Sequence, residues 1–151
     1  MSTSRRTMNT MSPPEDHVVA PDGSRIWELL ETAQASLVRC ELPAGGVSLA
    51  VRHRTIEEIW YFLEGRGEVW RRYPDDHQEA IDVRPGTCVR IPTGTAFQFR
   101  NTGADSLIFV IVTMPPWPGD QEADRVDDYW PTERAKGKNR ARTWRFRRPI
   151  S

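Results

Sequence analysis

His53 is one of only three histidines in this chain, and it stands shortly before a pair of glutamates in residues 52–70, RHRTIEEIWYFLEGRGEVW. Histidine titrates near neutral pH, and a carboxylate beside it can orient the imidazole to accept or donate a proton. An aromatic, apolar run follows the glutamates. These residue types favour general acid–base chemistry between His53 and one of the two glutamates.

The elements that must position these groups are short strands. Between residues 24 and 114, runs of β-branched and aromatic residues alternate with Gly, Pro, Asn and Asp turn signals. The runs cover residues 24–32, 36–42, 47–53, 58–63, 67–73, 80–83, 87–91, 96–101 and 107–114. Roughly nine strands at this spacing, without an intervening helical pattern, predict an all-β, single-domain antiparallel barrel or jelly roll.

The composition excludes several classes of partner. The 21 basic and 21 acidic residues cancel, so the overall charge does not attract nucleic acid or anionic lipid. No apolar run is long enough to span a bilayer, and residues 1–11 lack the apolar stretch of a secretion signal. Cys40 and Cys88 lie in separate predicted strands, which favours reduced thiols over the alternative of a disulfide. We expect a cytoplasmic protein that binds a small molecule.

Both ends of the chain differ in composition from the middle. We expect residues 1–21 to form a flexible arm, in which residues 17–20 would add an edge strand, and residues 22–117 to form the barrel. Residues 118–151 are an extension, acidic at first and basic from Arg134 onward. These charges predict a short helix over residues 120–130 and then a solvated tail. Alternatively, Trp144, Phe146 and the arginines contact the barrel, a second subunit or an anion; nucleic acid is the least favoured partner.

Two turn-rich segments resemble the two sequence motifs of the cupin superfamily. The first, GGVSLAVRHRTIEEIWYFLEG, supplies the family's glycine, histidine, glutamate and second glycine as Gly46, His53, Glu58 and Gly65. The second, GTCVRIPTGTAFQFRN, matches the family's offsets with Gly86, Pro92, Gly94 and Asn101. The resemblance extends over most of residues 22–115 and implies a small barrel whose strands turn at these glycines and prolines.

Half of the family's metal-ligand positions are substituted in this sequence. Metal-binding cupins direct a His-x-His pair, a glutamate and a histidine of the second motif into the barrel. The resemblance places Val51, His53, Glu58 and Phe97 at these positions, and valine and phenylalanine cannot ligate a metal. We therefore expect no tight metal site. The alternative is an iron, manganese, nickel or zinc ion that His53 and Glu58 hold together with a substrate or cofactor.

Strand alternation surrounds this pair with apolar side chains. The interior set is Val51, His53, Glu58, Trp60, Phe62, Phe97 and Phe99. The outward set is Arg52, Ile59, Tyr61, Gln98 and Arg100. In such an interior, desolvation raises a carboxyl pKa and lowers an imidazole pKa, whereas mutual attraction favours the charged pair. The sequence leaves both outcomes open, and also a purely structural pair inherited from a metal-binding ancestor.

Other candidates lie near one end of the predicted barrel. Arg39 would anchor a carboxylate if it points inward, although its default position is the surface. Met114 and Trp117 would form a lid or pack against the sheet. The predicted substrate-binding set is therefore Val51, Trp60, Phe62, Phe97, Phe99, Arg39, Met114 and Trp117. A candidate homodimer contact is formed by Tyr61 and Leu63 with Trp70.

Three functions fit these residues. The favoured one is a metal-independent enzyme that uses His53 and Glu58 for isomerisation, cyclisation, dehydration or a similar proton transfer. The second is a metal-dependent oxygenase or isomerase with a reduced ligand set. The third is a non-catalytic domain that binds or senses a ligand in the aromatic lumen.

Overall fold

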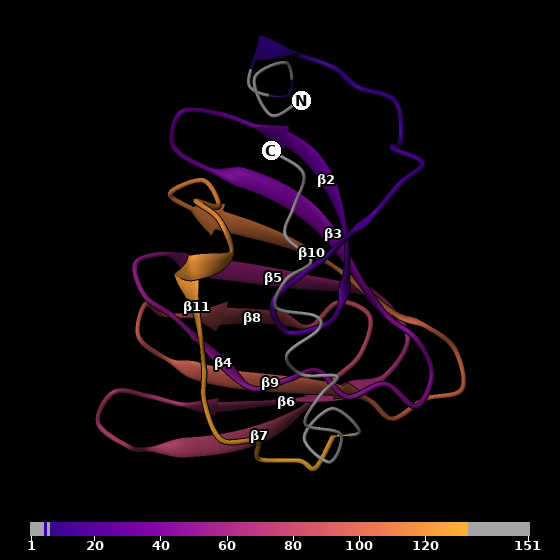
Figure 1. Cartoon of the computed structure of the whole chain (residues 1–151). Coiled ribbons are helices and arrows are strands. Elements are labelled where there is room, and N and C mark those ends of the chain that lie inside the picture. Colours follow the sequence, from indigo (N-terminus) through magenta and orange to yellow (C-terminus); the bar gives the residue numbers. More distant parts are fainter. Residues whose placement is uncertain (1–4, 6, 133–151) are drawn as a thin grey trace.

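Strands dominate the computed structural model, which describes residues 5 and 7–132 (Figure 1). The elements are β1 (Val18–Val19), β2 (Arg25–Glu31), β3 (Ser36–Leu42), β4 (Val51–His53), β5 (Glu57–Glu64), β6 (Gly67–Arg72), β7 (Gln78–Val83), β8 (Cys88–Ile91), β9 (Ala96–Asn101), β10 (Leu107–Met114), a 3-10 helix (Asp120–Glu122) and β11 (Ala123–Arg125). The strands form two sheets with only antiparallel pairs, in the orders β1-β2-β3-β10-β5-β8 and β11-β4-β9-β6-β7. The all-β antiparallel prediction is confirmed. None of the described residues form a helix long and apolar enough to cross a bilayer.

Side chains alternate between the interior and the surface, as the period of the strands requires. On β5, Glu58, Trp60 and Phe62 are buried, whereas Ile59 and Tyr61 are exposed. The inward residues of both sheets share one hydrophobic cluster. The two sheets therefore enclose a common interior, which contains the residues predicted to face the lumen.

An aromatic core fills much of the interior between the two sheets. Trp60, Phe62 and Phe109 come from the six-stranded sheet, and Phe97 and Phe99 come from the five-stranded sheet. Phe62 and Phe109 stack with 4.5 Å between ring centroids, and Trp60 meets Phe97 edge-on at 5.3 Å. Burial of each such side chain contributes about 1.5–3 kcal/mol to stability. This core supports the strands that carry His53 and Glu58.

The turn between β5 and β6 requires glycine. Gly65 has a φ of 88°, a left-handed conformation that side chains rarely adopt. A Cβ at this position would lie 2.5 Å from the carbonyl oxygen of Ser106. The glycine thus lets this turn, where the chain passes from the six-stranded to the five-stranded sheet, pack tightly against the residues just before β10.

Strand β4 is shorter than the predicted run over residues 47–53. The amide of Ser48 donates to the carbonyl of Phe99, and the amide of Leu49 donates to the carbonyl of Asp22. The amide of Ala50 donates to the carboxylate of Asp128 at 2.9 Å. Because these amides bond to three different segments, regular strand pairing begins only at Val51.

The prediction of a short helix over residues 120–130 is wrong. Only Asp120–Glu122 form a 3-10 turn, and Ala123–Arg125 form β11, which pairs with β4. The open edge of β4 offers backbone hydrogen bonds to an extended segment, and this tertiary pairing outweighs the local preference for helix. The predicted basic tail lies outside the described residues.

The segment after β11 covers two residues that the sequence analysis placed on the surface. Gln98 is fully buried, and its side-chain oxygen accepts from the amides of Tyr129 and Trp130 at 2.8 Å each. The indole of Trp70 stacks on Tyr129 with 5.2 Å between centroids and is also buried. Gln98 therefore does not face solvent, and Trp70 does not belong to an exposed dimer face.

The N-terminal segment closes one end of the barrel. Val18 pairs with Ile26 at the edge of the six-stranded sheet, which confirms the expected edge strand. The guanidinium of Arg5 contacts the carboxylate of Glu31 at 2.9 Å and donates to the carbonyl of Leu29 at 2.6 Å. The residues around β1 thereby become part of a wall of the interior. The division into an arm (1–21), a barrel (22–117) and an extension (118–151) stays a prediction.

Candidate functional site

A pocket opens at the end of the barrel where β3 and β5 begin and β10 ends. Its empty volume is about 850 Å³, including the open side. The apolar lining consists of Val18, Val19, Ala20, Pro21, Ile26, Val38, Val51, Trp60, Phe97, Ile111, Trp117 and Ala123. The polar lining consists of Arg5, Asp22, Ser24, Glu28, Glu31, Ser36, His53, Glu58, Thr113 and Asp120. This combination of an apolar lining with a few convergent polar groups is typical of a small-molecule site.

The floor of the pocket is formed by side chains from both sheets, namely from β4 and β9 of the five-stranded sheet and from β5 of the six-stranded sheet. Val51 and His53 project from β4, Glu58 from β5 and Phe97 from β9, and each is buried. Val51 pairs directly with Phe97 across the β4–β9 ladder. Because residues two apart in a strand share a face, Val51 and His53 both point inward, as the sequence predicted.

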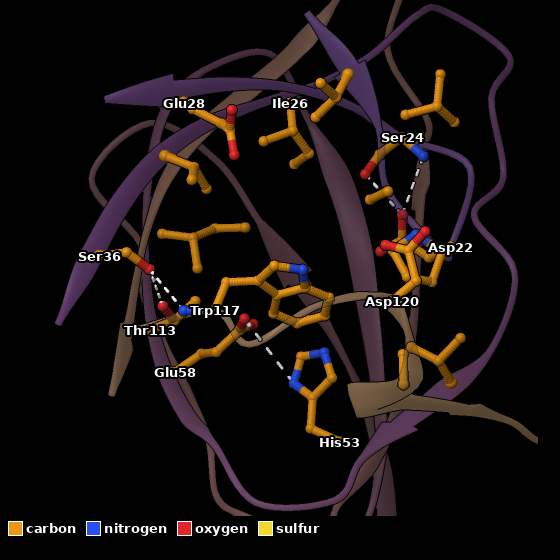
Figure 2. A pocket seen from close by; sticks show the side chains of 18 of the residues that line it. Asp22, Ser24, Ile26, Glu28, Ser36, His53, Glu58, Thr113, Trp117 and Asp120 are labelled. Atoms are coloured by element: carbon orange, nitrogen blue, oxygen red, sulfur yellow. Dashed lines mark hydrogen bonds and ion pairs between the residues drawn. The ribbon is translucent and has the colours of Figure 1, made fainter. Parts of the chain in front are cut away.

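His53 and Glu58 face each other without a hydrogen bond between them (Figure 2). His53 Nδ1 lies 3.8 Å from Glu58 Oε2, which is beyond hydrogen-bonding distance. The other carboxyl oxygen of Glu58 accepts from Trp60 Nε1 at 2.8 Å. His53 Nδ1 is buried and has no hydrogen-bond partner. A buried polar atom without a partner costs stability, and a bound molecule would satisfy it.

Two aromatic rings hold the imidazole. The ring of Phe97 lies 5.0 Å from that of His53 between centroids, and the indole of Trp117 lies 5.4 Å away, both edge-on. The backbone amide of Trp117 donates to the hydroxyl of Ser36 at 3.1 Å, and this hydroxyl also contacts that of Thr113. These contacts anchor the segment after β10 and place the indole inside the pocket (Figure 2).

Burial moves the pKa values of the two groups in opposite directions. Desolvation raises the pKa of Glu58 to about 8, and the charges of Asp22 and Glu122 act in the same direction, against the hydrogen bond from Trp60. Desolvation lowers the pKa of His53 to about 4, opposed by the charge of Glu122. At pH 7 both groups are therefore uncharged, so their contact is not an ion pair. The effect of desolvation on the two pKa values therefore outweighs the attraction between an ionised Glu58 and a protonated His53. The sequence had left open which of these two effects is larger.

The titration of His53 is directly measurable. We expect its Cε1 proton signal to titrate with a midpoint near pH 4, well below the ordinary histidine value of 6.5, because the buried imidazole resists protonation. Proton NMR from pH 3.5 to 8 measures the midpoint, and the His53→Ala variant assigns the signal among the three histidines. A midpoint at or above 6.5 would show that attraction to an ionised Glu58 dominates.

Glu122 is a buried carboxylate behind His53. It accepts hydrogen bonds from the amide of Thr55 at 2.5 Å, from the Thr55 hydroxyl at 2.7 Å and from the amide of Ile56 at 2.8 Å. Burial pushes its pKa upward, but these hydrogen bonds together outweigh burial and lower the pKa below its usual value. Glu122 thus stays charged and holds the connection between β4 and β5, which sets the distance from His53 to Glu58.

Removal of this carboxylate destabilises the fold. Glu122→Ala leaves two amides without acceptors, and we expect a loss of about 2–4 kcal/mol in the free energy of unfolding. Glu122→Gln keeps one acceptor oxygen, so its loss in the free energy of unfolding should be smaller. Because the folded pKa is lowered, the contribution of Glu122 is present above the unfolded value of 4.5 and disappears as pH falls through the folded pKa. Urea unfolding followed by tryptophan fluorescence at pH 7 and pH 4 measures both effects. An alanine variant within about 0.5 kcal/mol of wild type would contradict the structural role.

The structure brings together part of the predicted substrate-binding set. Val51, Trp60, Phe97 and Trp117 line the pocket with the catalytic candidates. The other predicted residues, Phe62, Phe99, Arg39 and Met114, do not line the pocket. Phe62 and Phe99 belong to the hydrophobic core, and Met114 is the last residue of β10. The guanidinium of Arg39 lies 4.8 Å from the indole centroid of Trp27.

Sequence reasoning missed the contribution of the N-terminal segment. Residues 18–22 line the pocket with Ser24, Glu28 and Asp120. The carboxylate of Asp22 accepts from both the amide and the hydroxyl of Ser24, at 2.9 and 2.6 Å. The expected edge strand at residues 17–20 was the one sequence signal for this segment. It did not locate the pocket, because nothing in the sequence indicates over which part of the barrel this strand passes.

Comparison with known proteins now decides the family. The model of the Cupin_2 family, described as a cupin domain, matches residues 38–113, half of the chain. The chain belongs to the cupin family.

Relatives of this cupin have varied names. It is 33% identical over 104 residues to the uncharacterized protein MJ1618 of Methanocaldococcus jannaschii, a match that covers 66% of this chain and 79% of the relative. It is also 33% identical over 67 residues to a glucose-6-phosphate isomerase of Thermococcus gammatolerans, covering 44% of this chain but only 33% of that enzyme. The structure resembles the capsular polysaccharide assembling protein CapF of Staphylococcus aureus, with a TM-score of 0.67, 17% identity and coverage of 78% and 35%. The last likeness shows the fold alone.

The donor set of this cupin does not fit the family's metal ion. Of the four ligand positions, Val51 and Phe97 are buried carbon side chains that pair with each other, and only His53 and Glu58 carry donor atoms. No group of three or more His, Cys, Asp or Glu side chains converges anywhere within residues 7–132. Two donors do not provide the chelation that holds a divalent ion against water.

Proposed function

We propose that this cupin is a metal-independent enzyme that transfers protons on a small molecule, with His53 and Glu58 as the acid–base pair. The observation that supports this most strongly is the pair itself: a neutral imidazole with an unpartnered Nδ1 faces a protonated carboxyl group, at 3.8 Å, in an apolar pocket. Environments that drive two pKa values apart assign one group as the base and the other as the acid.

The chemistry follows from these protonation states. His53 Nδ1 accepts a proton from a carbon beside a carbonyl group, while Glu58 donates its proton to the carbonyl oxygen, giving an enol. In an isomerisation, His53 then returns its proton to a neighbouring carbon, and Glu58 recovers a proton from an oxygen. In a dehydration, Glu58 gives its proton to the departing hydroxyl group instead of to the carbonyl oxygen while His53 accepts the proton from the carbon, so that water and a C=C bond form, and proton exchange with solvent restores both groups. Each group contributes about a hundred- to ten-thousand-fold when well placed.

The surroundings also support this function. Trp117 and Phe97 fix the imidazole, and Trp60 fixes the carboxyl group, so both groups are oriented before a ligand binds. One relative is named as an isomerase, a class of reaction that such a pair performs, although this chain spans only a third of that enzyme.

Proton exchange with solvent tests the proposal without knowledge of the product. The purified chain is incubated with EDTA in D2O with a panel of small aldehydes and ketones that carry an aromatic ring and a hydrogen on the α-carbon, and deuterium incorporation at this carbon is followed by NMR. We expect incorporation with wild type and a loss of at least about a hundredfold with His53→Ala. His77→Ala and Glu57→Gln, outside the pocket, serve as matched controls and retain the wild-type rate. Incorporation that His53→Ala leaves unchanged would refute the assignment; a panel that binds without exchange would favour the non-catalytic binding function.

We also propose that this cupin is a cytoplasmic homodimer. Ile59, Tyr61 and Leu63 form a row on the outer face of β5 and are exposed by 41%, 48% and 43%, which supports coverage of this face by a second copy. Cys40 and Cys88 are free thiols, as a reducing compartment favours. Light scattering after size-exclusion chromatography tests the dimer: Tyr61→Glu should yield monomers, and a wild-type monomer at about 50 μM would refute it.

A further inference from the structure

The lining of the pocket is rich in carboxyl groups that come from separate parts of the chain. Five acidic residues line it: Asp22, Glu28, Glu31, Glu58 and Asp120. The basic side chains in the described lining are those of Arg5 and His53. Figure 2 shows Asp22, Glu28, Glu58 and Asp120 on different sides of the indole of Trp117. An aromatic face surrounded by carboxyl groups is the chemistry that recognises an organic cation.

The one guanidinium in the described lining is already engaged by protein groups. Arg5 lies 2.9 Å from the carboxylate of Glu31 and 3.5 Å from that of Glu28, and it donates to the carbonyl of Leu29. The imidazole of His53 is neutral at pH 7, because burial lowers its pKa. Neither side chain therefore offers a free positive charge to an anionic ligand.

Asp22, when ionised, gives its surroundings in the pocket a negative potential. The charge of Asp22 raises the pKa of both Glu58 and Cys40, after the larger effect of burial in each case. Asp22 lines the pocket; burial raises its pKa above the ordinary value, and the two hydrogen bonds that it accepts from Ser24 oppose this rise and favour its ionised form. A cation near Asp22 would be stabilised by this potential, and an anion would be repelled.

A separate observation supports a bound molecule in this pocket. His53 Nδ1 is a polar atom on a side chain only 6% exposed, it has no hydrogen-bond partner, and its ring faces the pocket (Figure 2). Glu58, beside it, is protonated at neutral pH and has a hydrogen to donate. This floor suits the uncharged polar part of a ligand, whereas Asp22 lines another side of the pocket (Figure 2).

We propose that the molecule bound in this pocket carries a protonated amine, which lies beside Asp22 and over the indole of Trp117 while its uncharged polar part contacts His53 and Glu58. The inference rests on the proposed function only in that the pocket binds a small molecule. It excludes sugar phosphates and carboxylates as ligands, because such anions would meet Asp22 without a free cationic partner.

Binding of three matched probes to the full chain tests this selectivity. Benzylamine, benzyl alcohol and benzoate have one aromatic ring and differ in charge, and titration calorimetry or ligand-observed NMR at pH 7 measures their affinities. We expect benzylamine to bind about tenfold more tightly than benzyl alcohol, and benzoate to bind more weakly than both. Asp22→Asn keeps an acceptor for Ser24 and should reduce benzylamine affinity to that of benzyl alcohol, whose own affinity is unchanged.

Asp82→Asn is the matched control, because Asp82 is exposed on β7 and does not line the pocket. It should preserve the order of affinities. Benzoate binding as tightly as benzylamine, a preference that survives Asp22→Asn, or no binding of any probe would overturn the proposal. The two proposals fail separately: a preference for amines without deuterium exchange removes only the enzymatic function, and exchange without this preference removes only the cation selectivity.

Discussion

Glu58→Gln is expected to abolish proton transfer and, at the same time, to stabilise the protein at alkaline pH. The amide retains an oxygen that accepts from Trp60, but it has no proton to give to a substrate oxygen. We expect the exchange rate to fall by at least about a hundredfold. A gain in stability from the loss of a catalytic group is characteristic of a residue kept for function at a cost to the fold.

The sign of the stability change follows from the pKa of Glu58. Its folded value of about 8 lies above the unfolded value of 4.5, so between these pH values the folded chain binds a proton that the unfolded chain has lost. The free energy of unfolding therefore falls as pH rises through this window. His53 acts in the opposite sense between about 4 and 6.5, because its folded pKa is lowered. The effect of Glu58 is thus isolated between pH 6.5 and 8.

Urea unfolding of wild type and Glu58→Gln at pH 6.5 and 8 measures this effect. We expect the difference in unfolding free energy between the two proteins to shift by about 1.5 kcal/mol in favour of the variant over this range. Glu57→Gln, on the opposite face of β5, is the control and should show no such shift. Parallel pH profiles for wild type and Glu58→Gln would mean that Glu58 is ionised in the folded protein at pH 6.5.

Restoring two histidines should convert the pocket into a metal site. In the double variant V51H/F97H, imidazoles replace carbon side chains that pair directly across β4 and β9. The ring of Phe97 lies 5.0 Å from that of His53 between centroids, and Glu58 Oε2 lies 3.8 Å from His53 Nδ1. We expect the variant to bind about one equivalent of zinc or nickel, because four donors then surround one point.

Metal content and thermal unfolding measure the conversion. The variant without metal should be less stable than wild type, because two imidazoles are buried without partners, and zinc should raise its melting temperature markedly. V51A/F97A, with the same positions changed but no donors, should bind no more metal than wild type. A V51H/F97H protein that retains less than about a tenth of an equivalent after dialysis, with a melting temperature insensitive to zinc, would show that these positions do not converge.

Much of the fold was predictable from local pattern. The alternation along residues 57–64 identified which side chains of β5 point inward, and the pairing of glycine and proline signals located the turns. Gly65 illustrates why, since its backbone conformation and the nearby Ser106 carbonyl admit no side chain. Steric requirements of this kind act within a few residues and leave a clear trace in sequence.

The sequence predictions that proved wrong share one cause, namely contacts between segments that are distant in the sequence. Gln98 has the outward parity of its strand, yet Trp130 and Tyr129 cover it from more than 30 residues away. The helix predicted over residues 120–130 gave way to β11 because β4 has an open edge there. No periodicity within either segment indicates such a partner.

By itself, the sequence determined the antiparallel strands, the glycine turns and the shared interior position of Val51, His53, Glu58 and Phe97, since all of these depend on side-chain size and a period of two. Only the tertiary structure decided the protonation states of the pair and the charge of the pocket. Desolvation depends on every atom packed around a group, and residues 18–22 and Trp117 contribute atoms to the pocket from distant parts of the chain.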